Sequence, residues 1–178
     1  MAYTQKFIMN LRPPRVLWLL LAASLFALAG AYVAEYGFNL RPCILCLYQR
    51  LPYALAIGVL VITLGFMRLD AVMRWHKILP FILYLLAVVF ASGMVLAAYH
   101  TGVEHGVWAG PSVCASPTPG GDDLDALFRE IMQTPMVRCD VPAFVFLGLS
   151  MAGWNIFYSG MLMMIAIIGA RKAGNHGW

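Results

Sequence analysis

Four long apolar segments without a charged residue constrain the fold of this chain more than any other feature of its sequence. They are Val16–Ala34, Leu51–Met67, Ile78–Ala98 and Val141–Ala170. A helix of about 20 apolar residues is long enough to cross the hydrocarbon core of a bilayer. We therefore expect an all-α integral membrane protein, in which the 178 residues form a single four-helix bundle.

The second segment extends back to Cys43 if Arg50 is tolerated inside it, and the fourth is longer than one perpendicular helix needs. The expected spans are 16–34, 43–67, 78–98 and 143–170, with outer loops at 35–42 and 99–142. The chain is 62% hydrophobic and only 11% charged, whereas about a quarter of a soluble domain is charged. Basic residues precede the first segment, as in a secretory signal peptide, but its apolar run exceeds the usual length of about 7–15 residues. We expect it to be retained as a span.

Charged residues are divided unequally between the two sides of these spans. Eight of the twelve basic residues share a side with both termini: Lys6, Arg12, Arg15, Arg68, Arg74, Lys77, Arg171 and Lys172. Seven of the eight acidic residues fall on the other side: Glu35, Glu104, Asp122, Asp123, Asp125, Glu130 and Asp140. Because Lys and Arg are enriched in cytoplasmic loops, both termini are expected to be cytoplasmic. The basic balance thus reflects topology, and no nucleic-acid partner is expected.

All four cysteines fall on the outer side in this topology, Cys43 and Cys46 at the start of span two and Cys114 and Cys139 in the long loop. Disulfides persist in oxidising compartments such as the bacterial periplasm. Of the three possible connectivities, the short C-x-x-C spacing favours Cys43–Cys46 together with Cys114–Cys139. The second bond could simply staple a surface loop. A C-x-x-C disulfide, however, restricts the unfolded chain little, so redox chemistry or metal binding is its more usual purpose.

Zinc binding is the alternative purpose of these cysteines. Cys43, Cys46, Cys114 and His105 could together supply four ligands. A second pair of closely spaced ligands is missing from the sequence, because Cys114 and Cys139 are far apart. We therefore favour redox chemistry and expect no metal site.

Arg50 is aligned with the C-x-x-C pair if one helix begins near Pro42, a residue that suits a first turn. Positions 43, 46 and 50 would then share one helix face. A helix N-terminus and a nearby cation both favour a thiolate, so we expect them to ionise Cys46. Charges inside a membrane span are costly and usually functional, although Arg50 could also extend to the lipid headgroups.

A thiol pair at the edge of a bilayer needs an electron acceptor. The sequence contains no haem motif, no dinucleotide-binding fingerprint and no iron–sulfur spacing. By elimination, the expected acceptor is a lipid-soluble quinone.

Three runs of residues resemble motifs of the bacterial disulfide bond formation protein B (DsbB) family, and together they extend the resemblance over essentially the whole chain. They are Pro42-Cys43-Ile44-Leu45-Cys46-Leu47-Tyr48-Gln49-Arg50, Tyr99-His100-Thr101-Gly102-Val103-Glu104 with Gly110-Pro111, and Cys139-Asp140 with Phe146-Leu147-Gly148-Leu149-Ser150-Met151-Ala152 and Asn155. Some members of the family carry Glu where this chain has Gln49.

This resemblance implies a protein of the bacterial inner membrane that reoxidises a periplasmic thioredoxin-fold oxidant (DsbA) and passes the electrons to ubiquinone or menaquinone. It implies that the partner attacks Cys114 of a Cys114–Cys139 disulfide, and that Cys139 then attacks Cys43. Cys46 would engage the quinone, Arg50 would stabilise the charge, and His100 would lie near the quinone site.

Two other functions fit the same spans. A reductase of opposite direction, as in vitamin K epoxide reductase-like proteins, would use reduced quinone to open disulfides. A membrane scaffold would use its cysteines only for structure or for metal binding.

The long outer loop contains an amphipathic pattern, in which five apolar residues recur at helical spacing. They are Leu124, Leu127, Phe128, Ile131 and Met132. The segment is too short to span a membrane, so we expect a short helix lying on the outer leaflet. Packing on top of the bundle is the alternative.

Overall fold

The computed structural model describes residues 13–69, 75–111 and 138–175. Its helices are α2 (Pro13–Tyr32), the π-helical turn η1 (Val33–Gly37), α3 (Ile44–Tyr48), α4 (Leu51–Leu69), α5 (Trp75–Glu104) and α7 (Met151–Asn175). One small hairpin consists of β1 (Val145–Phe146) and β2 (Leu149–Ser150). Within these ranges, four helical segments are long and apolar enough to cross a membrane, which confirms the predicted all-α membrane fold.

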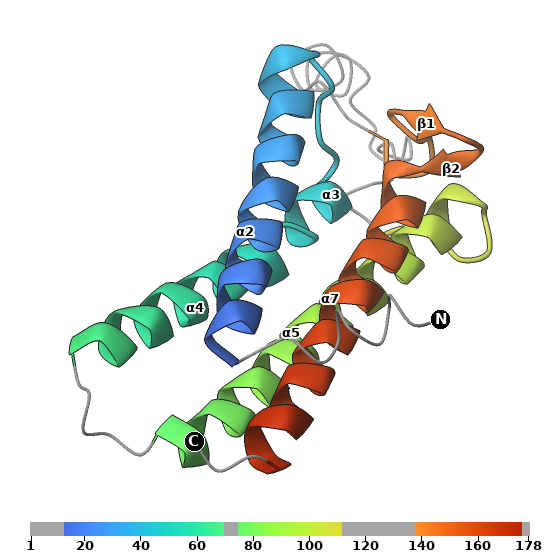
Figure 1. Cartoon of the computed structure of the whole chain (residues 1–178). Helices are drawn as coiled ribbons and strands as arrows, with labels where there is room; N and C mark the ends of the chain where they lie inside the picture. Colours follow the sequence, from blue (N-terminus) through green and yellow to red (C-terminus); the bar gives the residue numbers. More distant parts are fainter. Residues whose placement is uncertain (1–12, 70–74, 112–137, 176–178) are drawn as a thin grey trace, which may run out of the picture.

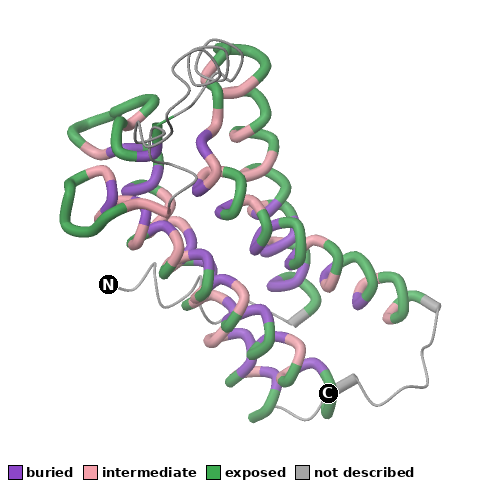
Figure 2. The backbone as a smooth tube through the Cα atoms, turned by 180° about the vertical axis from the view of Figure 1, so that it is seen from behind, coloured by how far each residue is buried: buried purple, intermediate pink, exposed green. Residues whose placement is uncertain are grey.

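The bundle is organised around α5 and α7, which lie side by side along most of their length, while α2 packs on α4 and α7 (Figure 1). Large apolar side chains from four helices are fully buried between them: Leu17, Leu20, Leu60, Leu83, Phe90 and Leu162. Other large apolar residues are exposed, and exposed stretches alternate with buried ones along the helices (Figure 2). Phe26 is 73% exposed and Phe81 70% exposed. Apolar residues on the outside of a bundle suit a lipid environment.

Span two, which the sequence places at 43–67 with a possible kink at Pro52, is interrupted just before that proline. α3 ends at Tyr48, and α4 begins at Leu51. Pro52 has no backbone N–H to donate to the Tyr48 carbonyl, so the ladder breaks there. The Arg50 N–H instead bonds to the Leu47 carbonyl, three residues back. The break separates a short helix carrying the cysteines from the main span.

Two further boundaries differ from the prediction. α5 continues to Glu104, so residues 99–104 are helical and not part of the loop. Residues 143–150 are not helical, because the chain forms the hairpin first, with Leu147 and Gly148 at positive φ (51° and 80°) in its turn. α7 then begins at Met151, where the Ser150 hydroxyl accepts the Gly153 N–H at 3.1 Å and so caps the helix.

One end of the bundle gathers η1, α3, the end of α5 and the hairpin (Figure 1). Glu35, Glu104 and Asp140 belong to this end, while Arg68, Lys77 and Arg171 lie at the opposite helix ends. The amphipathic helix expected at 124–132 lies outside the described residues.

The packing of α7 against α2 and α5 can be tested by adding a methyl group at Gly169. The new Cβ would lie 2.9 Å from Val16 Cγ1, which is too close, and 3.5 Å from Leu83 Cδ1. We expect Gly169→Ala to lower the free energy of unfolding by about 1–2 kcal/mol, since overpacking outweighs the gain in helix propensity. Gly174→Ala is the control, because nothing lies within 4 Å of its added Cβ. Unfolding by denaturing detergent, followed by circular dichroism, measures both, and equal midpoints would contradict the packing.

Candidate redox site

Cys43 and Cys46 lie at the first turn of α3 with their sulfur atoms side by side. Cys43 is the N-cap residue, and its sulfur accepts the Cys46 N–H at 3.3 Å. The two Sγ atoms are 3.0 Å apart and hydrogen-bonded, and both cysteines are free thiols. A disulfide would require about 2.05 Å. The predicted pair therefore stands together here as a reduced dithiol.

His100 of α5 reaches this dithiol from the neighbouring helix. Its Nε2 lies 3.5 Å from Cys43 Sγ, and its Nδ1 lies 2.7 Å from the Gln49 side-chain nitrogen. One turn further along α5, a Glu104 oxygen lies 3.8 Å from the same Nε2, and the Ser150 hydroxyl donates to Glu104. His100 is only 3% exposed, so these partners replace water around the ring.

Cys139 packs in the same buried cluster as Cys43, together with Leu45 and Val103. It is 1% exposed and disulfide-bonded. Its bonding partner lies outside the described residues, as does Cys114. The structure thus brings Cys139 next to the C-x-x-C pair, although 92 residues lie between Cys46 and Cys139 in the sequence.

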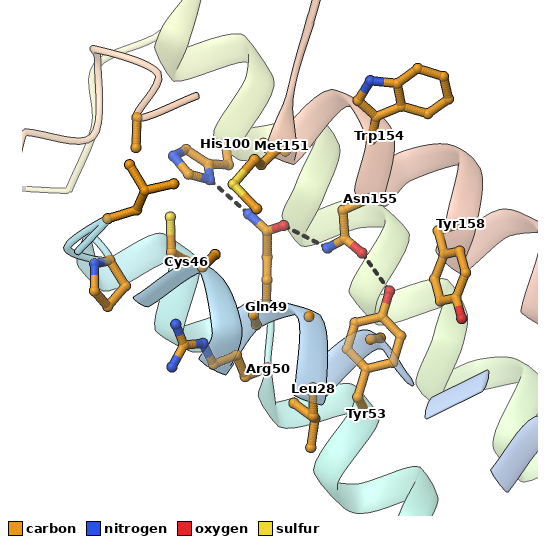
Figure 3. Close-up of a pocket in the computed structure, with 18 of the residues that line it drawn as sticks. Leu28, Cys46, Gln49, Arg50, Tyr53, His100, Met151, Trp154, Asn155 and Tyr158 are labelled. Atoms are coloured by element: carbon orange, nitrogen blue, oxygen red, sulfur yellow. Dashed lines mark hydrogen bonds between the residues drawn. The ribbon is translucent and has the colours of Figure 1, made fainter. Parts of the chain in front are cut away.

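Arg50 is placed differently from the prediction that it supports a Cys46 thiolate. Its guanidinium donates to Glu35 of η1 at 2.6 Å and lies 5.0 Å above the Tyr32 ring. The helix break after Tyr48 ends the continuous stripe on which that prediction depended. Figure 3 shows the Cys46 sulfur and the Arg50 guanidinium pointing in different directions.

The contacts of the dithiol favour Cys43 as the ionised sulfur, where the sequence favoured Cys46. A hydrogen bond from the Cys46 thiol is the largest cause that lowers the pKa of Cys43, and His100 and the Cys46 backbone add to it. Together they outweigh burial and bring this pKa from 9.0 to about 4. The N-cap position explains the difference, because donors at a helix start converge on the capping side chain.

A cavity of about 610 Å³ opens beside the dithiol between α2, α4 and α7. Cys46 lines it, as do Arg50 and His100, whereas Cys43 does not. Most of the remaining lining is apolar and comes from α2 and α7, including Leu28, Phe157 and Met161. The three predicted quinone-site residues therefore surround one apolar space (Figure 3).

A chain of hydrogen bonds runs from His100 along this cavity (Figure 3). Gln49 joins His100 to Asn155, whose Nδ2 donates to Gln49 Oε1 at 2.6 Å. The Tyr53 hydroxyl donates to Asn155 Oδ1 and lies 2.7 Å from Ser159 Oγ. This hydrogen-bond chain connects α5, the residues between α3 and α4, α7 and α4, and so holds these parts of the bundle in place relative to one another.

Sequence reasoning did not assign roles to Glu35, Gln49, Tyr53, Glu104 or Asn155. A weak signal was available, because His100 and Glu104 stand four residues apart on one face of α5, and Gln49 and Tyr53 are also four residues apart in the sequence. Polar side chains at that spacing within apolar helices indicate a buried contact.

Together, the four apolar spans and the buried dithiol beside a disulfide define a membrane thiol–disulfide protein. The model of the family "Disulfide bond formation protein DsbB" matches residues 13–169. The chain therefore belongs to the DsbB family of disulfide bond formation proteins.

Individual relatives agree with this assignment. Disulfide bond formation protein B of Mannheimia succiniciproducens is 34% identical over 88% of this chain and 87% of its own length. The protein of the same name from Xylella fastidiosa is 28% identical over 82% of this chain and 83% of its own. Uncharacterized protein RP370 of Rickettsia prowazekii is 30% identical over 82% and 80%. No solved structure matches the chain significantly.

The ionisation of Cys43 can be measured by thiolate ultraviolet absorbance in the reduced dithiol. Since the Cys46 thiol and His100 lower the pKa of Cys43, the thiolate is present at neutral pH, and its absorbance is lost only at a pH well below the usual range of a cysteine. Cys43→Ser should remove this transition. Cys46→Ala should move it to higher pH, because the main donor is gone. A single transition near 9 in the unsubstituted protein would contradict the assignment.

Proposed function

We propose that this protein is a quinone-dependent dithiol oxidase, which reoxidises a periplasmic thioredoxin-fold oxidant like DsbA and sustains disulfide bond formation. One observation carries the proposal. The dithiol has two faces, with Cys43 packed in the cluster that contains Cys139 and Cys46 lining the large apolar cavity. Such a pair can receive electrons from one side and deliver them to the other.

The cavity fits a quinone by size and chemistry. Small-molecule sites are commonly about 300–1,000 Å³, mostly apolar, with a few polar groups. Ubiquinone or menaquinone supplies an acceptor for two electrons and two protons. Arg50, His100 and Cys46 would hold its oxygen-bearing ring, and the apolar residues of α2 and α7 would hold its chain.

Thiol–disulfide exchange would bring electrons to the dithiol in balanced steps. A partner thiolate attacks Cys114 of the Cys114–Cys139 bond and releases Cys139 as a thiolate. Cys139 attacks Cys43 of a Cys43–Cys46 disulfide and releases Cys46. The partner's second thiol then frees Cys114, which attacks Cys139 and releases Cys43. The products are an oxidised partner, an intact loop disulfide and the reduced Cys43–Cys46 pair.

In this order the C-x-x-C pair ends as thiols while Cys139 is again disulfide-bonded. The short α3 helix supports the last step. It places the Cys46 N–H beside the Cys43 sulfur, α5 brings His100 to the same atom, and both groups stabilise a thiolate leaving from Cys139.

The same proposal places the protein in the bacterial inner membrane with both termini in the cytoplasm and its cysteines in the periplasm. Arg68, Lys77 and Arg171 lie at the end of the bundle opposite the cysteines. Their charge supports this orientation by the positive-inside rule.

Cys46→Ala tests the enzyme directly. Purified, oxidised protein is mixed with a reduced thioredoxin-fold donor and a soluble quinone, and quinone absorbance is followed. We expect the unsubstituted protein to turn over and Cys46→Ala to lose all quinone reduction, because the sulfur facing the cavity is missing. Turnover by the variant would contradict the role of Cys46. Activity only with reduced quinone and an oxidised partner would show a reductase, and no activity in either direction would favour a scaffold.

Arg50→Ala should raise the KM for quinone about tenfold or more, because a charged hydrogen-bond donor to a buried ligand contributes about 1.5–3 kcal/mol. Arg68→Ala is the matched control. Arg68 also lies over an aromatic ring, Trp18 at 5.8 Å, but it does not line the cavity. The KM for quinone of both variants is measured from steady-state rates at varied quinone concentration. An unchanged KM in Arg50→Ala would show that Arg50 does not bind quinone and serves only as the ion-pair partner of Glu35.

A further inference from the structure

Three metal-ligating side chains come together in the site, namely Cys43, Cys46 and His100. Their ligand atoms all lie within 4.8 Å of one another. We propose that the reduced dithiol and His100 form a binding site for a soft divalent cation, Zn²⁺, and that the bound ion holds the dithiol reduced. Zinc binding does not depend on the proposed oxidase activity. A dithiol held reduced by zinc could not be reoxidised by quinone, and this inhibition rests on the proposed function.

The distances between the donors are close to those of a tetrahedral zinc site. With Zn–S bonds of about 2.3 Å and Zn–N bonds of about 2.05 Å, a sulfur and a nitrogen ligand stand about 3.6 Å apart and two sulfurs about 3.8 Å apart. Cys43 Sγ and His100 Nε2 are 3.5 Å apart, and the two sulfurs are 3.0 Å apart. The two sulfurs must therefore move apart, while Cys43 and His100 already stand at the spacing that zinc requires.

A second, small cavity of about 40 Å³ supplies the space for the ion. All three donors line it, together with Glu104. This volume exceeds what a single water molecule needs, so it accommodates an ion and one further ligand. Glu104, which lies 3.8 Å from His100 Nε2, could bind the ion or accept a hydrogen bond from its water. Two thiolates neutralise Zn²⁺, which limits repulsion from Arg41 and Arg138 at the cavity wall.

The hydrogen-bond chain behind His100 can serve the ring in either tautomer. In one tautomer the Gln49 amide donates to Nδ1 of His100, and the proton of the ring is then on Nε2, beside the sulfur. A ring that binds a metal through Nε2 carries its proton on Nδ1 and must donate it. If both terminal amides turn over, His100 donates to Gln49, Gln49 to Asn155, Asn155 to Tyr53 and Tyr53 to Ser159. The same contacts are then made with every donor and acceptor role reversed, because they run through amides whose oxygen and nitrogen can exchange places.

This site differs from the zinc site considered from the sequence, which used His105 and Cys114. His105 lies beyond the end of α5 and is exposed, whereas His100 is buried against both sulfurs. The site also depends on redox state, because a Cys43–Cys46 disulfide has no thiolate to offer. This proposal departs from the expectation of no metal site, and it does so for the reduced state alone.

Zinc binding is tested in the full-length protein carrying Cys114→Ser and Cys139→Ser, so that only one cysteine pair changes oxidation state. Competition with a chromophoric chelator measures bound Zn²⁺, and Cd²⁺ reports thiolate ligation through its charge-transfer absorbance. We expect one Zn²⁺ per reduced chain and none after oxidation. His100→Ala should weaken binding about 100-fold or more, since even the loss of a group that only supports a ligand costs about 10–100-fold. Cys43→Ser and Cys46→Ser should each lower the charge-transfer band by half or more, and the double substitution should abolish it.

His105→Ala is the matched control and should bind Zn²⁺ as tightly as the parent. Circular dichroism of each variant confirms that it is folded. The proposal is overturned if reduced and oxidised protein bind equal amounts, which would show surface binding, or if His105→Ala loses the ion while His100→Ala keeps it. Because the binding measurement contains neither a thiol donor nor a quinone, its outcome does not depend on whether the protein is an oxidase. If Zn²⁺ also inhibits quinone reduction, and a chelator reverses the inhibition, the bound ion controls the activity as well.

Discussion

The break between α3 and α4 determines how the residues at the start of span two face the site. A continuous helix through Pro52 would place Cys46 and Arg50 on one stripe and would point Gln49 elsewhere. Since Pro52 cannot donate a hydrogen bond, the chain turns at Gln49 and Arg50 instead. Arg50 thereby reaches Glu35, Gln49 turns inwards to His100, and the short α3 presents its N-terminus to the buried cysteine cluster.

The number and class of spans could be predicted from the sequence, because apolar length is a local property of the chain. The C-x-x-C motif and its helix were equally local. The contacts of Arg50 and His100 could not be predicted, since Glu35 and Gln49 reach them only through the packing of separate helices. The hairpin before α7 was missed for a different reason. Its residues are as apolar as a span, and only the Leu147-Gly148 turn and the Ser150 cap distinguish them.

Polar groups inside an apolar bundle are costly unless each has a partner. The chain from His100 through Gln49, Asn155 and Tyr53 to Ser159 satisfies this condition while lining the large cavity. Its members come from different helices, so the network fixes the walls of the cavity as well as the orientation of the His100 ring. The same residues therefore serve structure and site together, and a substitution among them should affect both.

A dithiol that passes electrons must exist in two states, and its surroundings must tolerate both. In the oxidised state Cys43 and Cys46 are bonded to each other and need no donors. In the reduced state a buried thiolate must be stabilised, and the Cys46 N–H and His100 do this at Cys43. Groups that stabilise a thiolate also place a nitrogen ligand beside two sulfurs. Affinity for a soft cation is thus a direct consequence of the arrangement that makes the thiolate a good leaving group, and exclusion of such ions would require weakening that arrangement.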